Sequence, residues 1–322
     1  MNAVRLERQG PPEVLHTVEC PEPRPAPSEV VVEVAAAGVN FIDVYLRNGL
    51  YPLDLPSGIG REGAGHVVAV GTAVTDRTVG DRVAFCDATG AYAELVAIDA
   101  SRTVVVPDTL DLDLAAALLV QGMTAHYLTH DTYPLRAGDT ALVYAAAGGT
   151  GGLLVQLAHR AGARVLACTS TDEKAARARR LGADEVIRYR DEEIAPRVRE
   201  LTDGRGVDVA YDSVGRDTFD ASLASLRPRG LLALYGQSSG TVGPVDLQLL
   251  ARHGALFVTR PTLLPYVATA EELTRRAAAV FSLVIEGALD VMIHGRYPLA
   301  DAARAHRDLE SATTTGKLLL VP

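Results

Sequence analysis

A glycine-rich segment near the middle of the chain has the residue types needed to bind a phosphate group. An apolar run, residues 141–145, precedes Gly148-Gly149-Thr150-Gly151-Gly152, and apolar residues then recur at helical spacing. Glycines let a backbone approach a pyrophosphate closely, and a helix N-terminus offers unpaired N–H groups with partial positive charge. Residues 146–151 depart from strict G-x-G-x-x-G, so an ordinary strand–helix turn is the alternative. The position between a buried strand and an amphipathic helix favours a dinucleotide site.

The end of the next expected strand, residues 164–169, bears on which nicotinamide dinucleotide would bind. An acidic residue near this strand end commonly binds the ribose 2′-hydroxyl of NAD. Here neutral residues follow, and then Lys174, whose ammonium can pair with a 2′-phosphate. The sequence therefore predicts NADPH rather than NADH. Two observations stand against this: Lys174 could be a solvated helix residue, and the carboxylate of Asp172 could bind a hydroxyl instead.

Composition excludes several other classes of function. The chain of 322 residues has a formal net charge of -9 and no basic stretch, so we expect no nucleic-acid partner. No apolar run reaches the ~18 residues of a membrane span, and the first residues lack the layout of a signal peptide. We therefore expect no membrane association and a cytoplasmic location. The three cysteines, Cys20, Cys86 and Cys168, are far apart, which argues against disulfides and against a structural zinc lobe.

Two kinds of pattern along the chain predict two domains. Short β-branched runs in the first third, such as residues 30–35 and 66–71, are typical of a small β-barrel. Farther along, expected strands alternate with expected helices, which predicts an α/β domain with a doubly wound parallel sheet. We expect this Rossmann domain over residues 118–262, inserted in a split first domain of residues 1–117 and 263–322.

Several segments together resemble the zinc-less quinone oxidoreductases of the medium-chain dehydrogenase/reductase superfamily, the group of bacterial quinone reductase and zeta-crystallin. The resemblance covers almost the whole chain and is carried by residues 40–45, 47–52, 145–151, 211–218 and 258–261. It implies a GroES-like, mainly β domain beside the Rossmann domain in the chain. It also implies an NADPH-dependent enzyme that transfers hydride to a quinone-like acceptor without a metal.

The resemblance further implies roles for individual residues. The substrate and nicotinamide site would contain Asn40, Tyr45 and Tyr51. The residues that would bind the cofactor are Thr124, Gly148, Gly149, Thr150, Lys174, Tyr189, Ser213, Gly236, Ser238 and Arg260. Among these, the glycines and Thr150 would hold the pyrophosphate, and Lys174 and Tyr189 the 2′-phosphate and adenosine.

Two positions depart from the family pattern and concern the preference for NADPH. Gln121 stands where a lysine is common, and Ala312 stands where an arginine would contact the cofactor. Lys317 lies close enough in sequence to replace that arginine, and the sequence leaves this open.

The resemblance also predicts that no metal takes part. Zinc-dependent relatives have a cysteine at or near the position of Asn40, and a His-Glu pair where this chain has Arg61-Glu62. Without the thiolate and the imidazole, a tetrahedral zinc site lacks ligands. Negative charge would grow on an acceptor oxygen during hydride transfer, and the Tyr45 hydroxyl or the Asn40 amide could stabilise it. No proton donor is assigned.

Three alternatives remain at this point. An enoyl or alkenal (enone) double-bond reductase would use the same fold and cofactor and would differ only in the acceptor. A non-catalytic NADPH-binding or RNA-binding crystallin-like protein is an alternative of another class, although the acidic composition offers no electrostatic surface for RNA. The G-x-S-x-G pattern at residues 236–240 matches a hydrolase nucleophile, but the residues after it predict a loop where that motif needs a helix.

A homodimer is expected from the end of the second domain. Residues 255–259 are expected to form the edge strand of the parallel sheet. Pairing of two such edges across a two-fold axis would cover both.

Overall fold

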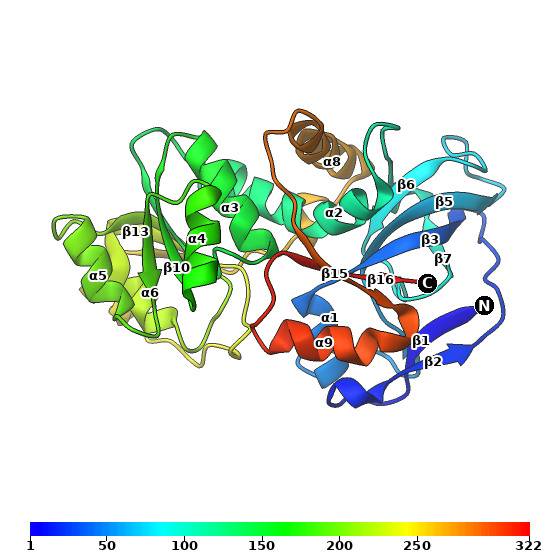
Figure 1. The fold of residues 1–322 in the computed structure, drawn as a ribbon, viewed down its shortest axis with the longest axis horizontal. Coiled ribbons are helices and arrows are strands. Elements are labelled where there is room, and N and C mark those ends of the chain that lie inside the picture. The colour runs from blue at the N-terminus through cyan, green and yellow to red at the C-terminus, as the bar shows by residue number, and fades with distance from the viewer. The chain divides into compact units, whose positions relative to one another are not determined.

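The computed structural model of the chain describes residues 1–322 and divides into two compact units (Figure 1). Unit 1 contains residues 1–123 and 264–322, and unit 2 contains residues 124–263. The first division falls inside helix α2, Leu112–Tyr127, where the sequence pattern does not change. The boundaries expected from the sequence, 117/118 and 262/263, lie close to these divisions.

Unit 1 is mainly β, as expected of a GroES-like domain. Its larger sheet has the strand order β15-β16-β3-β5-β6-β8, with β7 also paired to β3, and its smaller sheet has the order β2-β1-β4. The strands are β1 (Asn2–Leu6), β2 (Leu15–Glu19), β3 (Glu29–Val39), β4 (Ser57–Gly58), β5 (Glu62–Val70), β6 (Arg82–Cys86), β7 (Leu95–Asp99), β8 (Thr103–Val105), β15 (Ile293–Pro298) and β16 (Lys317–Val321).

Helices of unit 1 lie between and after these strands. Besides most of α2 they are α1 (Phe41–Asn48), α8 (Ala270–Ile285) and α9 (Ala302–Glu310), with short 3-10 turns at Pro12–Val14, Ala100–Arg102, Leu264–Tyr266 and Leu299–Asp301. Helix α8 begins with a capping box, in which Thr269 and Glu272 each accept a hydrogen bond from the other's backbone N–H at 3.2 Å. None of the helices combines the length and the apolar character that a membrane span requires.

The end of strand β3 is the point in unit 1 where distant segments meet. On one side β16 pairs with it, and Leu318 lies opposite Val39. On the other side β5 pairs with it, and Glu62 lies opposite Gly38. The first residues of two flanking strands are therefore brought to the place where β3 ends and α1 begins.

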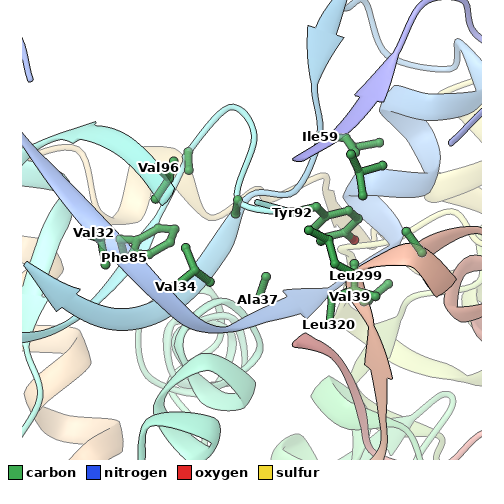
Figure 2. Close-up of a cluster of buried hydrophobic side chains, with 14 of the residues drawn as sticks. Val32, Val34, Ala37, Val39, Ile59, Phe85, Tyr92, Val96, Leu299 and Leu320 are labelled. Carbon is green, nitrogen blue, oxygen red and sulfur yellow. The ribbon is translucent and has the colours of Figure 1, made fainter. Parts of the chain in front are cut away.

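The core of unit 1 contains two tyrosines, Tyr92 and Tyr297, among its apolar side chains. The ring of Tyr92 lies among Val39, Ile59 and Leu299 (Figure 2), and all four residues belong to the same buried cluster. Because a buried hydroxyl is costly without a partner, the Tyr92 hydroxyl donates to Asp43 Oδ2 at 2.9 Å. The cluster thus contacts α1 through the hydrogen bond from Tyr92 to the Asp43 carboxylate on that helix.

Unit 2 is a doubly wound domain with a six-stranded sheet in the order β11-β10-β9-β12-β13-β14. All five strand pairs are parallel. The strands are β9 (Thr140–Val143), β10 (Arg164–Thr169), β11 (Glu185–Arg188), β12 (Val207–Asp212), β13 (Leu226–Leu234) and β14 (Phe257–Thr259). The helices are α3 (Gly149–Arg160), α4 (Asp172–Arg180), α5 (Ile194–Leu201), α6 (Phe219–Ser225) and α7 (Gln248–Arg252), preceded by a π-helical turn at Leu128–Thr132.

The strand order of unit 2 sets where a ligand would bind. The chain moves outward from β9 to β10 and β11, and then returns to the other side of β9 at β12. Right-handed crossovers therefore place α3 and α4 on one face of the sheet and α5 and α6 on the other. The strand order reverses between β9 and β12, and ligands of such sheets bind outside the carboxyl ends of the strands at this reversal.

Candidate functional site

Nine of the ten residues expected to bind a cofactor follow the carboxyl ends of parallel strands in unit 2. Since all six strands run the same way, these ends form one edge of the sheet. The nine residues, each in the connection or helix start that follows its strand, are Gly148, Gly149 and Thr150 after β9, Lys174 after β10, Tyr189 after β11, Ser213 after β12, Gly236 and Ser238 after β13, and Arg260 after β14. The tenth, Thr124, lies on α2.

The loop after β9 is shaped by close backbone approach. Gly148 is the N-cap of α3, and Ala145 has a positive φ of 48°, a strained conformation for a residue with a Cβ. A Cβ at Gly151 would lie 2.2 Å from the carbonyl oxygen of Ala145, so only glycine fits there. Strain of this kind at a helix N-terminus is typical of a phosphate cradle, and the loop fits the pyrophosphate of a dinucleotide.

Lys174 is a partly buried cation after the end of β10. It lies in the first turn of α4, where its backbone N–H donates to Thr171 Oγ1 at 3.3 Å. Burial, and then the charge of Arg190, lower the pKa of Lys174. A bound anion would offset both effects, which suits a phosphate. Sequence reasoning missed Arg190, although it directly follows Tyr189.

The acidic residue that opposed NADPH at this strand end forms a surface ion pair. Asp172, whose side chain is 86% exposed, pairs with Arg188. The hydroxyl of Thr169, at the end of β10, is buried and has no hydrogen-bond partner in the chain, which is rare for a buried polar group.

The loops after β12 and β13 are held against each other. The buried carboxylate of Asp212 accepts from the backbone N–H of Val214 and from the hydroxyls of Thr218 and Ser222, at 2.7–2.9 Å. A Cβ at Gly236 would lie 2.5 Å from the carbonyl oxygen of Ser213. The N–H of Ser238 donates to that same oxygen at 3.2 Å. Ser213, Gly236 and Ser238 are thus brought together, and Asp212 positions them. Sequence reasoning gave Asp212 no role.

In unit 1, Asn40 begins helix α1, and its side chain also bonds to the neighbouring strands. Asn40 is the N-cap of α1 in a capping box with Asp43, whose Oδ2 accepts from the Asn40 backbone N–H at 2.9 Å. The Nδ2 of Asn40 donates to Glu62 Oε1 at 2.6 Å and its Oδ1 accepts from Lys317 Nζ at 2.7 Å. Of the two candidate donors to an acceptor oxygen, Asn40 is therefore committed within the protein.

Tyr45 and Tyr51 form an aromatic pair on and after α1. Their ring centroids are 5.4 Å apart and the rings meet edge to face, an arrangement that aromatic pairs prefer. The N–H of Tyr51 donates to the carbonyl of Tyr45 at 3.0 Å. The structure thus brings Tyr45 and Tyr51 together, while Asn40 stands at the start of the helix that carries Tyr45.

A buried polar chain runs from α1 to α9. Tyr92 Oη lies 3.2 Å from Nε2 of His306, and Nδ1 of His306 lies 3.2 Å from Arg47. Because Arg47 can only donate, His306 accepts at Nδ1 and carries its proton on Nε2. Arg47 also forms two hydrogen bonds of 2.8 Å with Glu310. Burial raises the pKa of Asp43 to about 7, and burial and then Arg47 lower the pKa of His306 to about 3.

These two shifts predict how the stability of the protein depends on pH. The unfolded Asp43 ionises above its ordinary pKa of 3.8, so its contribution to stability is present at low pH and is lost as pH rises through about 7. The contribution of His306 to stability has the opposite pH dependence. It is lost as pH falls from the ordinary pKa of histidine, 6.5, through about 3. We expect Asp43→Asn to remove the first effect, so that stability falls more steeply from about pH 6.5 toward pH 4, by up to about 1.4 kcal/mol per pH unit. Urea denaturation across this range measures it, and parallel curves for variant and wild type would contradict it.

The suggestion that Lys317 replaces a cofactor-contacting arginine is wrong. Its side chain is 1% exposed, and its ammonium is bound to Glu62 and Asn40 in unit 1.

No cluster of three or more His, Cys, Asp or Glu side chains is placed to hold a metal ion. His126 and His130 stack on each other, with ring centroids 4.1 Å apart. The three cysteines are free thiols, and no helix follows Ser238, as a hydrolase nucleophile would require.

A parallel sheet with a strained glycine loop, joined in one chain to a β-rich unit that carries polar and aromatic residues, defines a two-domain dehydrogenase/reductase of the medium-chain class. Residues 26–108 match the family described as alcohol dehydrogenase GroES-like domain, and residues 181–320 match the family described as zinc-binding dehydrogenase. A quinone oxidoreductase of Pseudomonas aeruginosa is 46% identical, with 99% of each chain covered.

Two further relatives complete the comparison. The structure of an Escherichia coli quinone oxidoreductase complexed with NADPH matches with a TM-score of 0.98 at 43% identity, covering 100% of both chains. A 2-haloacrylate reductase of Burkholderia sp is 40% identical, covering 99% of this chain and 98% of the relative. This chain belongs to the quinone oxidoreductase family of the medium-chain dehydrogenase/reductase superfamily.

Proposed function

We propose that this chain reduces a quinone-like acceptor with hydride from NADPH and without a metal. The observation that carries the proposal is the set of nine residues at one edge of the parallel sheet, which includes the glycines after β9 and Lys174. The relative solved with NADPH supports the choice of cofactor. NADPH, when bound, supplies the hydride.

Each end of the cofactor would be bound by a different part of unit 2. The backbone of Gly148, Gly149 and Thr150 would bind the pyrophosphate at the start of α3. Lys174 would bind the 2′-phosphate together with Arg190, and Tyr189 would contact the adenosine. Ser213, Gly236, Ser238 and Arg260 would bind the remainder, and Thr124 would lie near the nicotinamide.

Residues of unit 1 would bind the acceptor. The rings of Tyr45 and Tyr51 would contact a flat, electron-poor molecule; Tyr45 is 7% exposed and Tyr51 lies at its edge. The Tyr45 hydroxyl or the Asn40 amide, which also bonds to Glu62 and Lys317, would stabilise negative charge on the acceptor oxygen. Reduction without a metal is supported by the residues at the position where zinc-dependent relatives have a His-Glu pair. Arg61 forms an ion pair with Asp87 at 2.5 Å, and Glu62 forms an ion pair with Lys317.

A panel of acceptors tests the proposal. The absorbance of NADPH and of NADH would be followed with quinones and with enones, each with and without a metal chelator. We expect saturable turnover of quinones with NADPH that the chelator leaves unchanged. Loss of activity to the chelator would contradict the metal-free reaction, and binding of NADPH without any turnover would favour a non-catalytic role.

Reduction of an activated carbon–carbon double bond is the second candidate. A 2-haloacrylate reductase among the relatives favours it, because a haloacrylate is an activated alkene. In the same panel, turnover of enones with none of quinones would identify this activity.

We also propose that two copies pair through strand β14, which is an edge of the six-stranded sheet. Phe257 on this strand is 60% exposed, beside the exposed Val258. Light scattering should give twice the chain mass of 34.0 kDa, and Phe257→Arg should give the single-chain mass. Val79→Arg, at an apolar residue of unit 1 that is 65% exposed, is the matched control and should stay dimeric. A monomeric wild type at micromolar concentration would refute the pairing.

A further inference from the structure

Three buried polar side chains meet where strand β3 ends. Asn40 follows β3, while Glu62 and Lys317 are the first residues of the strands on either side of it, β5 and β16. Lys317 and Glu62 form an ion pair with side chains 1% and 0% exposed. Asn40, 6% exposed, bonds to both. The antiparallel register of the sheet thus places one cation and one anion at a single amide.

The chemistry of these two partners permits only one orientation of that amide. A lysine ammonium can only donate hydrogen bonds, and a carboxylate can only accept them. The observed arrangement has Oδ1 at Lys317 and Nδ2 at Glu62. Rotation of the amide by half a turn would place its N–H groups against the ammonium and its oxygen against the carboxylate. Both contacts would be repulsive. Two neutral partners would not create this repulsion, so they would not fix the orientation of the amide as strictly.

The residues around Glu62 hold its carboxylate beside Asn40. Its second oxygen, Oε2, accepts from the backbone N–H of Val120 at 2.7 Å, which ties it to α2, the helix that carries Thr124. A Cβ at Gly38 would lie 2.4 Å from Glu62 Oε1 and 2.8 Å from the carbonyl oxygen of Ala116, so glycine is required for the carboxylate to fit. Burial of a charged pair is costly, and removing either partner leaves an uncompensated charge.

We propose that Lys317 and Glu62 are positioning residues for the reductase reaction, because they fix the amide of Asn40 and with it the start of α1. The inference rests on the proposed function, since α1 carries Tyr45 of the acceptor site. Asn40 is linked to the start of α1 by its backbone N–H, which donates to Asp43 Oδ2 at 2.9 Å, so the orientation of Asn40 bears on that helix. Neither Lys317 nor Glu62 is placed to touch the acceptor, and each acts through Asn40.

The composition of the chain makes the geometry directly measurable. Lysine occurs only at positions 174 and 317, and asparagine only at positions 2, 40 and 48. With ¹⁵N in the side chains of these residues, NMR should show one slowly exchanging ammonium signal that disappears in Lys317→Met. In Glu62→Gln and in Lys317→Met, the side-chain amide signals of Asn40 should shift while those of Asn2 and Asn48 do not. An unmoved Asn40 pair in both variants would overturn the proposal.

Kinetics of the paired variant separate positioning from stability. Lys317→Met/Glu62→Gln removes both charges, so no lone charge remains in the interior. We expect its kcat with the best acceptor to fall by about 10- to 100-fold, while its KM for NADPH changes less than about two-fold because the cofactor residues lie in unit 2. A double variant with wild-type kcat would show that the pair is only structural and would overturn the proposal.

A control variant measures the effect of losing the ion pairs of a buried carboxylate whose arginine partners are partly exposed. Asp208, at the amino end of β12, is bound by Arg205 and Arg227 at 2.6 and 2.5 Å. Asp208→Asn should lower Tm but keep wild-type kcat when assayed well below that Tm. If the wild-type protein reduced neither quinones nor enones, the proposed function would fail, and the labelled amide signals would still decide whether Lys317 and Glu62 hold Asn40.

Discussion

Replacing Lys174 by alanine should raise the KM for NADPH by about 10- to 100-fold and leave the KM for NADH nearly unchanged. The two dinucleotides differ by the 2′-phosphate, and a hydrogen bond to a charged group is worth about 1.5–3 kcal/mol. Burial, and then the charge of Arg190, lower the pKa of Lys174, and a bound phosphate would offset both effects. Steady-state kinetics with each dinucleotide measures the difference.

A neighbouring variant controls for the loss of one positive charge. Arg179 lies on the same helix, α4, and is exposed. Arg179→Ala should leave both KM values within about two-fold, since an exposed charge in salt solution acts weakly at a distance. If Lys174→Ala weakened NADPH and NADH equally, Lys174 would not be a phosphate ligand.

The second large effect is expected from the substitution Gly151→Ala. A Cβ there would lie 2.2 Å from the carbonyl oxygen of Ala145 and 3.0 Å from that of Tyr144, both of which are backbone atoms. The loop must therefore move, which should lower stability by about 1–3 kcal/mol and weaken NADPH binding by on the order of 100-fold. Calorimetric titration with NADPH and thermal unfolding measure the two effects.

The adjacent glycine offers a matched control for this substitution. A Cβ at Gly152 would meet a methyl group of Leu181 at 3.1 Å, a flexible side-chain end rather than backbone. Gly152→Ala should bind NADPH as wild type does and gain slightly in stability, because alanine is favoured over glycine in a helix by up to about 1 kcal/mol. Normal NADPH affinity in Gly151→Ala would mean that the loop does not need its close backbone approach.

Local sequence patterns were enough to predict most of unit 2. Strand β10 has the bounds that were expected from its apolar run, residues 164–169. Buried parallel strands are continuous apolar runs, so their pattern is strong. Helix α1 was not predicted as a helix, since it is short and contains β-branched and aromatic residues with low helix propensity.

The contacts that define the site in unit 1 could not be predicted from local pattern. Lys317 lies 277 positions from Asn40 and 255 from Glu62 in the sequence. Only the register of β16 and β5 on β3 brings them together. For the same reason, the sequence allowed Lys317 to be a cofactor ligand, whereas its burial in unit 1 excludes that. The roles of Asn40, Tyr45, Tyr51 and the cofactor residues remain predictions.

The place of β16 in the chain has a consequence for synthesis on the ribosome. This strand is translated after all of unit 2, yet β3 needs it as a neighbour, and Asn40 needs its lysine. At about 5–20 residues per second, the nucleotide domain would leave the ribosome and fold while β3 waits on the order of 10 to 60 s for its partner. Unit 2 ends at residue 263 and β16 begins at residue 317, so a nascent chain would complete the nucleotide domain about 3 to 11 s before it gains the lysine that Asn40 needs.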